Sequence, residues 1–245
     1  PRFFTWQPVR LPAALAPHES IHLSFGWWYD LPAVPSRQGV IDPTTFYVAY
    51  FYPRVAVYDD YNGWDTMDHA GHEFYSDFND YDVTVKVPTN YVVWGTGTLT
   101  NAADLLQPAA LARFQASFAS DTTIHVGTGA QIHAGQVTAR DSTNAWHFTA
   151  TDVPDMAYGL SDHYDWDAAS VVVDDSTHRR ASAQAAYNDT ASDFHQMVKF
   201  VSHSLDFLSH QWPGVPYPYE KMTGFQGGAG MEYPMMANDE SYPSD

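Results

Sequence analysis

The chain has 245 residues, of which 44% are hydrophobic and 16% aromatic, so it can bury one large core or two modest ones. This composition excludes a disordered chain. The formal net charge of −18 would repel phosphate backbones and anionic lipids, and no apolar run is long enough to cross a bilayer. We therefore expect no nucleic-acid partner and no membrane insertion. Because cysteine is absent, disulfide scaffolds, thiolate zinc sites and cysteine nucleophiles are excluded as well.

The first two-thirds of the chain predict β-structure. Apolar and polar residues alternate with the period of a strand over residues 19–25, 81–87 and 146–150. Residues 46–52 are apolar on both faces, which is typical of a strand that is buried on two sides. Residues 101–118 are rich in alanine, leucine and glutamine and predict one short helix.

The pattern changes near residue 155. Residues 171–173 predict a short buried strand, and residues 180–187 are suited to pair with it as a hairpin. Thr190 and Asp193 have the spacing of a capping box, and apolar residues then recur at helical spacing from residue 194 to 208. Pro213 and Gly214 are expected to end this helix. The apolar, glycine-rich tail over residues 217–236 predicts two short strands joined by a flexible turn.

The expected fold class is mainly β. It comprises a β-rich domain over residues 1–154 and the first part of a mixed α/β domain over residues 155–245. With one helix and a few strands, the second part would leave apolar faces uncovered, so we expect it to be incomplete. The chain opens at Pro1 without a basic and apolar leader, so we expect it to begin after processing or in the middle of a longer protein.

A short motif near the start of the chain suggests zinc chemistry. His18-Glu19-Ser20-Ile21-His22 matches H-E-x-x-H, the signature of zinc peptidases. The two histidines can bind one ion only on a helix, where residues i and i+4 share a face. The alternation around the match favours a strand, on which the two side chains would stand roughly 13 Å apart. We therefore interpret this match as accidental.

A single acidic residue, Glu232, lies within the apolar and small residues of the segment 225–236. Burying a lone carboxylate is costly unless it meets a cation or several donors, and the small residues before it let another backbone come close. Together these features favour an extended peptide that lies along an edge strand with its positive end at Glu232. We therefore expect the Glu232 carboxylate to be buried in a nearly apolar groove. A glycine turn followed by an ordinary core strand would give a similar pattern.

The segment 225–236 reads FQGGAGMEYPMM. It resembles the G-x-M-E-N substrate-recognition motif of the aminopeptidase N-like zinc metallopeptidases, the gluzincins, and is similar to a bacterial branch in which the motif reads G-G-M-E-Y-P-M. Residues 52–60, 63–66 and 212–219 resemble the same branch, and the likeness covers nearly the whole chain. Ala229 stands where the motif begins with glycine, and Tyr233 replaces its usual asparagine.

The resemblance implies a fold and a site. The fold is a saddle-like β-sandwich domain followed by the start of an α+β thermolysin-like catalytic domain, with the methionine-glutamate segment as an edge strand. In that family the glutamate binds the free α-amino group of the substrate. The resemblance therefore assigns this role to Glu232 and places the peptide against Ala229, Gly230 and Met231. The expected partners are a peptide with a free N-terminus and the remainder of the catalytic domain, in a periplasmic or secreted protein.

The same resemblance implies zinc in the full-length protein. In the family the zinc ligands follow the methionine-glutamate strand, so we expect none of them in this chain and no activity from it alone. Two other functions stay open from the sequence. One is a non-catalytic interaction protein of the same fold, which would lack an H-E-x-x-H helix after this strand. The other is an aromatic-lined β-sandwich that binds glycans or polymers.

Overall fold

The computed structural model describes residues 5–69 and 74–242, and this part of the chain is mainly β. Its strands are β1 (Gly39–Asp42), β2 (Thr45–Ala49), β3 (Tyr58–Asp59), β4 (Gly63–Trp64), β5 (Asn79–Pro88), β6 (Val92–Gly95), β7 (Thr98–Leu99), β8 (Ile124–Gly127), β9 (Thr143–Val153), β10 (Ala157–Ser161), β11 (Asp165–Asp174), β12 (Arg179–Tyr187), β13 (Lys221–Gln226), β14 (Met231–Tyr233) and β15 (Met236–Asp239). Its helices are α1 (Ala102–Leu105), α2 (Pro108–Ser117), α3 (Gly129–His133), the 3-10 helix η1 (Ser192–Gln196) and α4 (Met197–His210).

The chain divides into two compact units. The smaller is drawn from Pro1–Asp30 and Phe51–Phe78, and the larger from Leu31–Tyr50 and Asn79–Asp245, within the described ranges. Residue 154 lies inside the larger unit, and the division into domains 1–154 and 155–245 stays a prediction. In the described part of the chain, no helix is both long enough and apolar enough to cross a bilayer.

The smaller unit contains the hairpin β3–β4. Gly63 has a φ of 74°, which the turn requires and glycine tolerates, and the Asp59 carboxylate accepts hydrogen bonds from the backbone of the turn. The strand predicted over residues 19–25 is wrong, because these residues form no regular structure. Ile21, Leu23 and Phe25 are 41%, 41% and 55% exposed. Alternation predicts a strand only where the apolar side chains have a face to bury.

In the larger unit a four-stranded sheet has the order β1-β2-β10-β6. Strand β2 replaces the strand predicted over residues 46–52 and differs from it in two respects. Thr45, Tyr47 and Ala49 are fully buried while the residues between them are partly exposed, so the strand alternates instead of burying both faces. It ends at Ala49 because Tyr50 has a φ of 54°, in the left-handed region that breaks a strand.

A three-stranded sheet of order β5-β9-β7 confirms the strands predicted over residues 81–87 and 146–150. The single helix predicted over residues 101–118 is instead two helices, α1 and α2. Pro108 occupies the first turn of α2. Proline favours the start of a helix and cannot lie in its interior, which explains the break.

The six-stranded sheet has the order β14-β15-β13-β12-β11-β8. The antiparallel pair β11–β12 confirms the predicted hairpin, although β11 is longer than the predicted residues 171–173. Strand β13 lies between β12 and β15 and runs parallel to both. Strand β14 pairs with β15 in the antiparallel direction. The tail over residues 217–236 therefore holds the two predicted strands, β13 and β14, and a third strand, β15, begins at its last residue.

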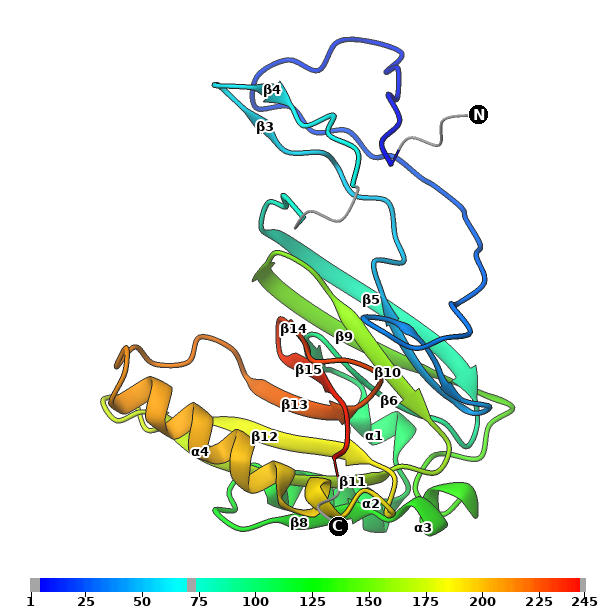
Figure 1. The fold of residues 1–245 in the computed structure, drawn as a ribbon, viewed down its shortest axis with the longest axis vertical. Helices are drawn as coiled ribbons and strands as arrows, with labels where there is room; N and C mark the ends of the chain where they lie inside the picture. Colours follow the sequence, from blue (N-terminus) through cyan, green and yellow to red (C-terminus); the bar gives the residue numbers. More distant parts are fainter. Residues whose placement is uncertain (1–4, 70–73, 243–245) are drawn as a thin grey trace. The chain divides into compact units, whose positions relative to one another are not determined.

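Helix α4 packs on this sheet, against β11, β12 and β13 (Figure 1). Val198, Val201 and Leu205 recur at the predicted helical spacing and share a core cluster with Ala181 and Ala183 of β12. The short alanine side chains leave room for the larger helix residues, so large and small side chains interdigitate. The helix ends at His210, before Pro213 as predicted.

The predicted capping box is wrong. The chain enters α4 through the 3-10 helix η1, and the Thr190 hydroxyl donates to the Asn188 side-chain oxygen at 2.7 Å instead of capping the helix. The Asp193 carboxylate accepts the Ser241 hydroxyl and, at 2.7 Å, the Tyr242 backbone N–H. Asp193 therefore accepts hydrogen bonds from residues that are distant in the sequence. The spacing of Thr190 and Asp193 could not indicate these partners.

Aromatic rings from different sheets meet around Phe225 of β13, which is fully buried. Its ring centroid lies 5.4 Å from Tyr47, 5.9 Å from Trp94 and 5.3 Å from Tyr164. A Cβ atom added at Gly159 of β10 would lie 2.4 Å from Cε2 of Phe225. The glycine is therefore required for the close packing of the six-stranded sheet against the four-stranded sheet.

Lys221, the first residue of β13, makes the stability of the fold depend on pH. Burial lowers its pKa from 10.5 to about 7. The unfolded chain thus binds this proton over a pH window in which the folded chain does not, so the free energy of unfolding rises with pH from about 7 to 10.5. Below that window the cost of the buried ammonium group is present in full.

We expect the effect of Lys221→Met on the free energy of unfolding to be more stabilising at acidic than at alkaline pH. The stability of the variant relative to wild type should be highest near pH 6 and should fall by ~1.4 kcal/mol for each pH unit within that window. Urea unfolding of both proteins at pH 6, 8.5 and 10.5 measures the difference. A difference that is the same at all three pH values would contradict the buried amine.

Candidate functional site

Strand β14 forms one edge of the six-stranded sheet. It pairs only with β15 among the described strands, through Met231 with Asn238, Glu232 with Ala237 and Tyr233 with Met236. The backbone groups on its outer side are therefore unpaired within the described part of the chain. An edge of this kind is a template for the addition of another extended strand.

The turn that leads into β14 is held by Asn238 of the neighbouring strand. The Asn238 side chain is buried, accepts the Gly228 backbone N–H at 3.1 Å and donates to the Ser36 carbonyl oxygen at 3.1 Å. A Cβ atom at Gly227 would lie 1.8 Å from the Asn238 side-chain oxygen, so this position requires glycine. At Gly230 the nearest atom would be 3.9 Å away. The packing of the described residues therefore does not require glycine at residue 230, and its surroundings are open.

Tyr233 anchors the other end of β14. Its side chain is buried, and its hydroxyl donates to the Arg37 carbonyl oxygen at 2.8 Å and lies 3.1 Å from the Tyr50 hydroxyl. Burial, followed by the hydrogen bond with Tyr50, raises the pKa of Tyr233 well above its usual value. Its ring also packs against Tyr47, with centroids 5.7 Å apart. Tyrosine in place of the asparagine of the resembled motif thus has a structural role here.

The four residues assigned to substrate binding are contiguous on this edge. Gly230 and Glu232 are exposed, and Ala229 and Met231 are partly exposed. The expectation that the Glu232 carboxylate is buried in an apolar groove is wrong, because alternation along β14 directs Tyr233 into the core and leaves Glu232 in solvent. Within residues 5–69 and 74–242, no side chain pairs with this carboxylate.

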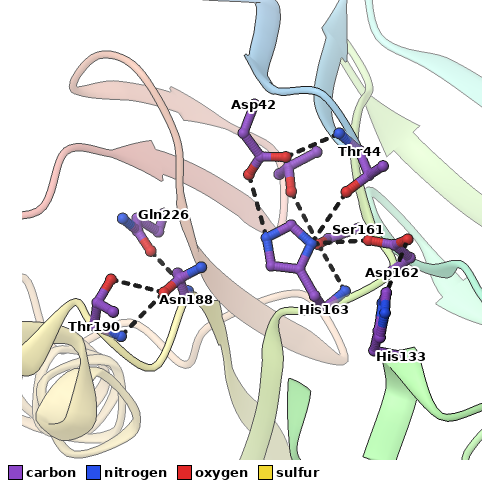
Figure 2. A network of polar contacts seen from close by, with 10 residues as sticks. Asp42, Thr44, His133, Ser161, Asp162, His163, Asn188, Thr190 and Gln226 are labelled. Atoms are coloured by element: carbon purple, nitrogen blue, oxygen red, sulfur yellow. Dashed lines mark hydrogen bonds and ion pairs between the residues drawn. The ribbon is translucent and has the colours of Figure 1, made fainter. Parts of the chain in front are cut away.

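A second polar cluster lies at the end of β10, around His163 (Figure 2). The ring Nδ1 lies 2.8 Å from an Asp162 carboxylate oxygen, and Nε2 lies 3.3 Å from an Asp42 carboxylate oxygen. Partial burial raises the pKa of Asp162, but hydrogen bonds and the nearby histidines outweigh this and hold the pKa below its usual value. His163 therefore lies between two carboxylates, one on each ring nitrogen.

The cluster does not form a catalytic triad. The Ser161 hydroxyl lies 3.4 Å from His163 Nδ1, but the same nitrogen is closer to Asp162. Ser161 is also fully buried, and its hydroxyl is 2.9 Å from that of Thr45. A nucleophile must reach a substrate and needs the base for itself, and Ser161 meets neither condition. The cluster joins β10 to the loop between β1 and β2.

A pocket of about 320 Å³ lies beside His163, and Gly129, Asp165 and Asp189 are among its lining residues. Burial raises the pKa of Asp165, and neighbouring carboxylates add to the shift. On the far side, the Asn188 backbone N–H donates to the Gln226 side chain at 2.8 Å (Figure 2). No sequence motif indicates this pocket, because its residues come from separate segments of the chain.

No protein-family model and no curated protein matches the sequence. The resemblance to the gluzincins therefore stays a prediction, and so does the thermolysin-like character of the second part of the chain. What is established is a mainly β fold with several antiparallel strand pairs, and a β14 edge on which Glu232 is exposed.

The zinc ligands that the resemblance implies would follow this chain, and the described residues offer no zinc site of their own. Across residues 5–69 and 74–242, no group of three or more histidine, cysteine, aspartate or glutamate side chains is placed to hold a metal ion. Residues 19–22 of the H-E-x-x-H match are neither helix nor strand, and His18 has a φ of 66°. The segment thus lacks the helix that this signature needs.

Proposed function

We propose that the β14 edge binds an extended peptide with a free N-terminus and that Glu232 receives its ammonium group, as the substrate-recognition part of a zinc-dependent aminopeptidase. The observation that carries this proposal is the position of Glu232, an exposed carboxylate without a partner on the edge strand of a sheet. Because the described residues do not fit a zinc site, the proposal assigns only the binding of the amino end to them.

The edge supplies the main-chain part of the binding. An added peptide strand pairs its backbone with the outer side of β14, and alternate side chains set its specificity. The open surroundings of Gly230 leave space for the peptide just before Glu232. Tyr233 and Asn238 fix the two ends of this segment through buried hydrogen bonds, so little ordering is needed when the peptide binds.

The carboxylate supplies selectivity for the amino end. In the free protein the Glu232 carboxylate is solvated. An ion pair exposed to water contributes little binding free energy. A peptide strand over β14 would exclude water from the carboxylate, and a charge-assisted hydrogen bond to the ammonium group would then strengthen. The net charge of −18 also attracts cationic groups. Fixing the N-terminus in this way presents the first peptide bond at a constant distance from Glu232, as an aminopeptidase requires.

The simplest test compares free and N-acetylated forms of one peptide. We expect acetylation to weaken binding to the chain by roughly ten-fold or more, because it removes the charge that Glu232 receives. Fluorescence anisotropy with a label at the peptide C-terminus measures both affinities. Equal affinities would show that Glu232 does not hold the amino end.

The hypothesis of a non-catalytic interaction protein predicts the same binding but no hydrolysis. Cleavage of an unblocked aminoacyl reporter by the full-length protein, abolished by a metal chelator, distinguishes the two. The aromatic-lined module that binds glycans stays a prediction.

A further inference from the structure

The side chain of Lys221 is buried next to a cavity outside the β14 edge. Lys221 is 8% exposed, and its Nζ donates to the Thr223 hydroxyl at 3.3 Å and to the Met235 carbonyl oxygen at 3.2 Å. No carboxylate of the described residues lies within ion-pair distance of this amine. An ammonium group has three N–H donors and a neutral amine has two with one lone pair. The two acceptors present thus satisfy the neutral amine fully and the ammonium group only in part.

The cavity has a volume of about 60 Å³, more than a single water molecule needs. Its walls include the buried aromatic residues Trp94, Phe114, Phe148 and Trp166. Three exposed residues, Thr98, Phe118 and Glu220, also line it, so the cavity reaches the surface. Apart from Lys221, Glu220 is the only charged residue among those that line the cavity. This surrounding favours a small, uncharged and mainly apolar molecule.

Trp94 lines the cavity with its ring, but its indole N–H is buried away from any water-sized space and has no hydrogen-bond partner among the described residues. The cavity therefore offers a ligand its apolar walls and the Lys221 amine. A small, uncharged carbonyl compound matches both.

We propose that Lys221 is a carbonyl-reactive amine that forms an imine with a small aldehyde held in this cavity. The amine lone pair attacks the carbonyl carbon, the π electrons of the C=O bond move to the oxygen, and one proton passes from the nitrogen to that oxygen, giving a carbinolamine. Loss of the remaining nitrogen proton and of the hydroxyl group as one water molecule leaves the uncharged C=N bond of the imine. The reaction needs no oxidant or reductant, and its product suits an apolar cavity.

The electrostatics of the site agree with this chemistry. Burial lowers the pKa of Lys221 to about 7, so much of the amine is neutral at physiological pH. An exposed lysine in water is almost wholly protonated at this pH. Only the neutral amine is a nucleophile, and desolvated lysines are activated in this way. The proposal does not rest on the peptide-binding role of β14.

The chain has three lysines, so it contains its own controls. Lys86 and Lys199 are exposed, on β5 and α4. The experiment treats the intact chain at pH 7 with limiting propionaldehyde and cyanoborohydride, which reduces the imine to a stable propyl amine, and maps the adducts by mass spectrometry. We expect Lys221 to react at least ~10-fold faster than either exposed lysine, because of its larger neutral fraction. This comparison needs no variant and therefore no assumption about folding.

A second aldehyde tests the role of the cavity. Pyridoxal 5′-phosphate, which is large and anionic, should label the exposed lysines in preference to Lys221. The proposal is overturned if propionaldehyde labels Lys221 no faster than Lys86 and Lys199, or if the bulky aldehyde labels Lys221 equally well.

Discussion

Phe225→Ala is expected to lower the free energy of unfolding by about 3–5 kcal/mol, the usual range for a buried phenylalanine. Its ring is fully buried and contacts Tyr47, Trp94 and Tyr164, which come from different parts of the larger unit. Its removal leaves a cavity between two sheets that the surrounding rings fill only in part. Urea unfolding, followed by tryptophan fluorescence and circular dichroism, measures the loss.

Two variants control this result. Phe200→Ala makes the same change at a residue of α4 that is 52% exposed, and should cost less than about 1 kcal/mol. Gly159→Ala should destabilise the wild-type protein strongly, because its Cβ atom would clash with the Phe225 ring. In the Phe225→Ala background this clash is gone, and Gly159→Ala should cost much less. Additive effects of the two changes would contradict the packing of Phe225 on Gly159.

Glu232→Gln is expected to weaken the binding of an unblocked peptide by roughly ten- to hundred-fold. This corresponds to about 1.5–3 kcal/mol, the range for a hydrogen bond to a charged group. Glutamine keeps the size of the side chain and the backbone of β14, so the change tests the charge alone. Isothermal titration calorimetry measures the affinity, and in the full-length protein kcat/KM for an unblocked aminoacyl substrate should fall by a similar factor.

Glu220→Gln is the matched control for the loss of charge. Glu220 is also exposed and precedes β13 of the same sheet, so the change alters the net charge equally. It should leave peptide affinity within about two-fold, since long-range effects of one exposed charge are screened by salt. If both variants weaken binding alike, the effect comes from the overall charge of the protein and not from Glu232.

The sequence predicts best those strands and helices that bury one face, because burial imposes a regular spacing on their apolar residues. Residues 81–87 and 146–150 alternate, and they lie in β5 and β9, which pair with each other. Val198, Val201 and Leu205 of α4 likewise recur at the predicted helical spacing and are buried, whereas Leu208, at the end of the same pattern, is 46% exposed. The segment 19–25 has the same alternation but forms no strand, because pattern alone does not supply a partner. The capping box fails for a related reason, since residues near the chain end engage Asp193.

The sequence predicts where the candidate site lies in the chain but not whether its side chains are buried or exposed. The glycine run and the lone acidic residue indicated an edge strand, and β14 is one. The exposure of Glu232 depends on which side of β14 faces the core, which Tyr233 decides through contacts with Arg37 and Tyr50. These residues lie far away in the sequence. The His163 cluster and the Lys221 cavity likewise assemble from distant segments, and no local motif could indicate them.

The most direct test is a cycle of four affinities: wild type and Glu232→Gln, each with the free and the N-acetylated form of one peptide. Acetylation is expected to weaken binding to wild type by roughly ten-fold or more, the range for a charge-assisted hydrogen bond. It should have little effect on binding to the variant, because the two changes remove the same interaction. If acetylation weakens binding equally in both proteins, or in neither, the carboxylate of Glu232 does not receive the amino end of a peptide.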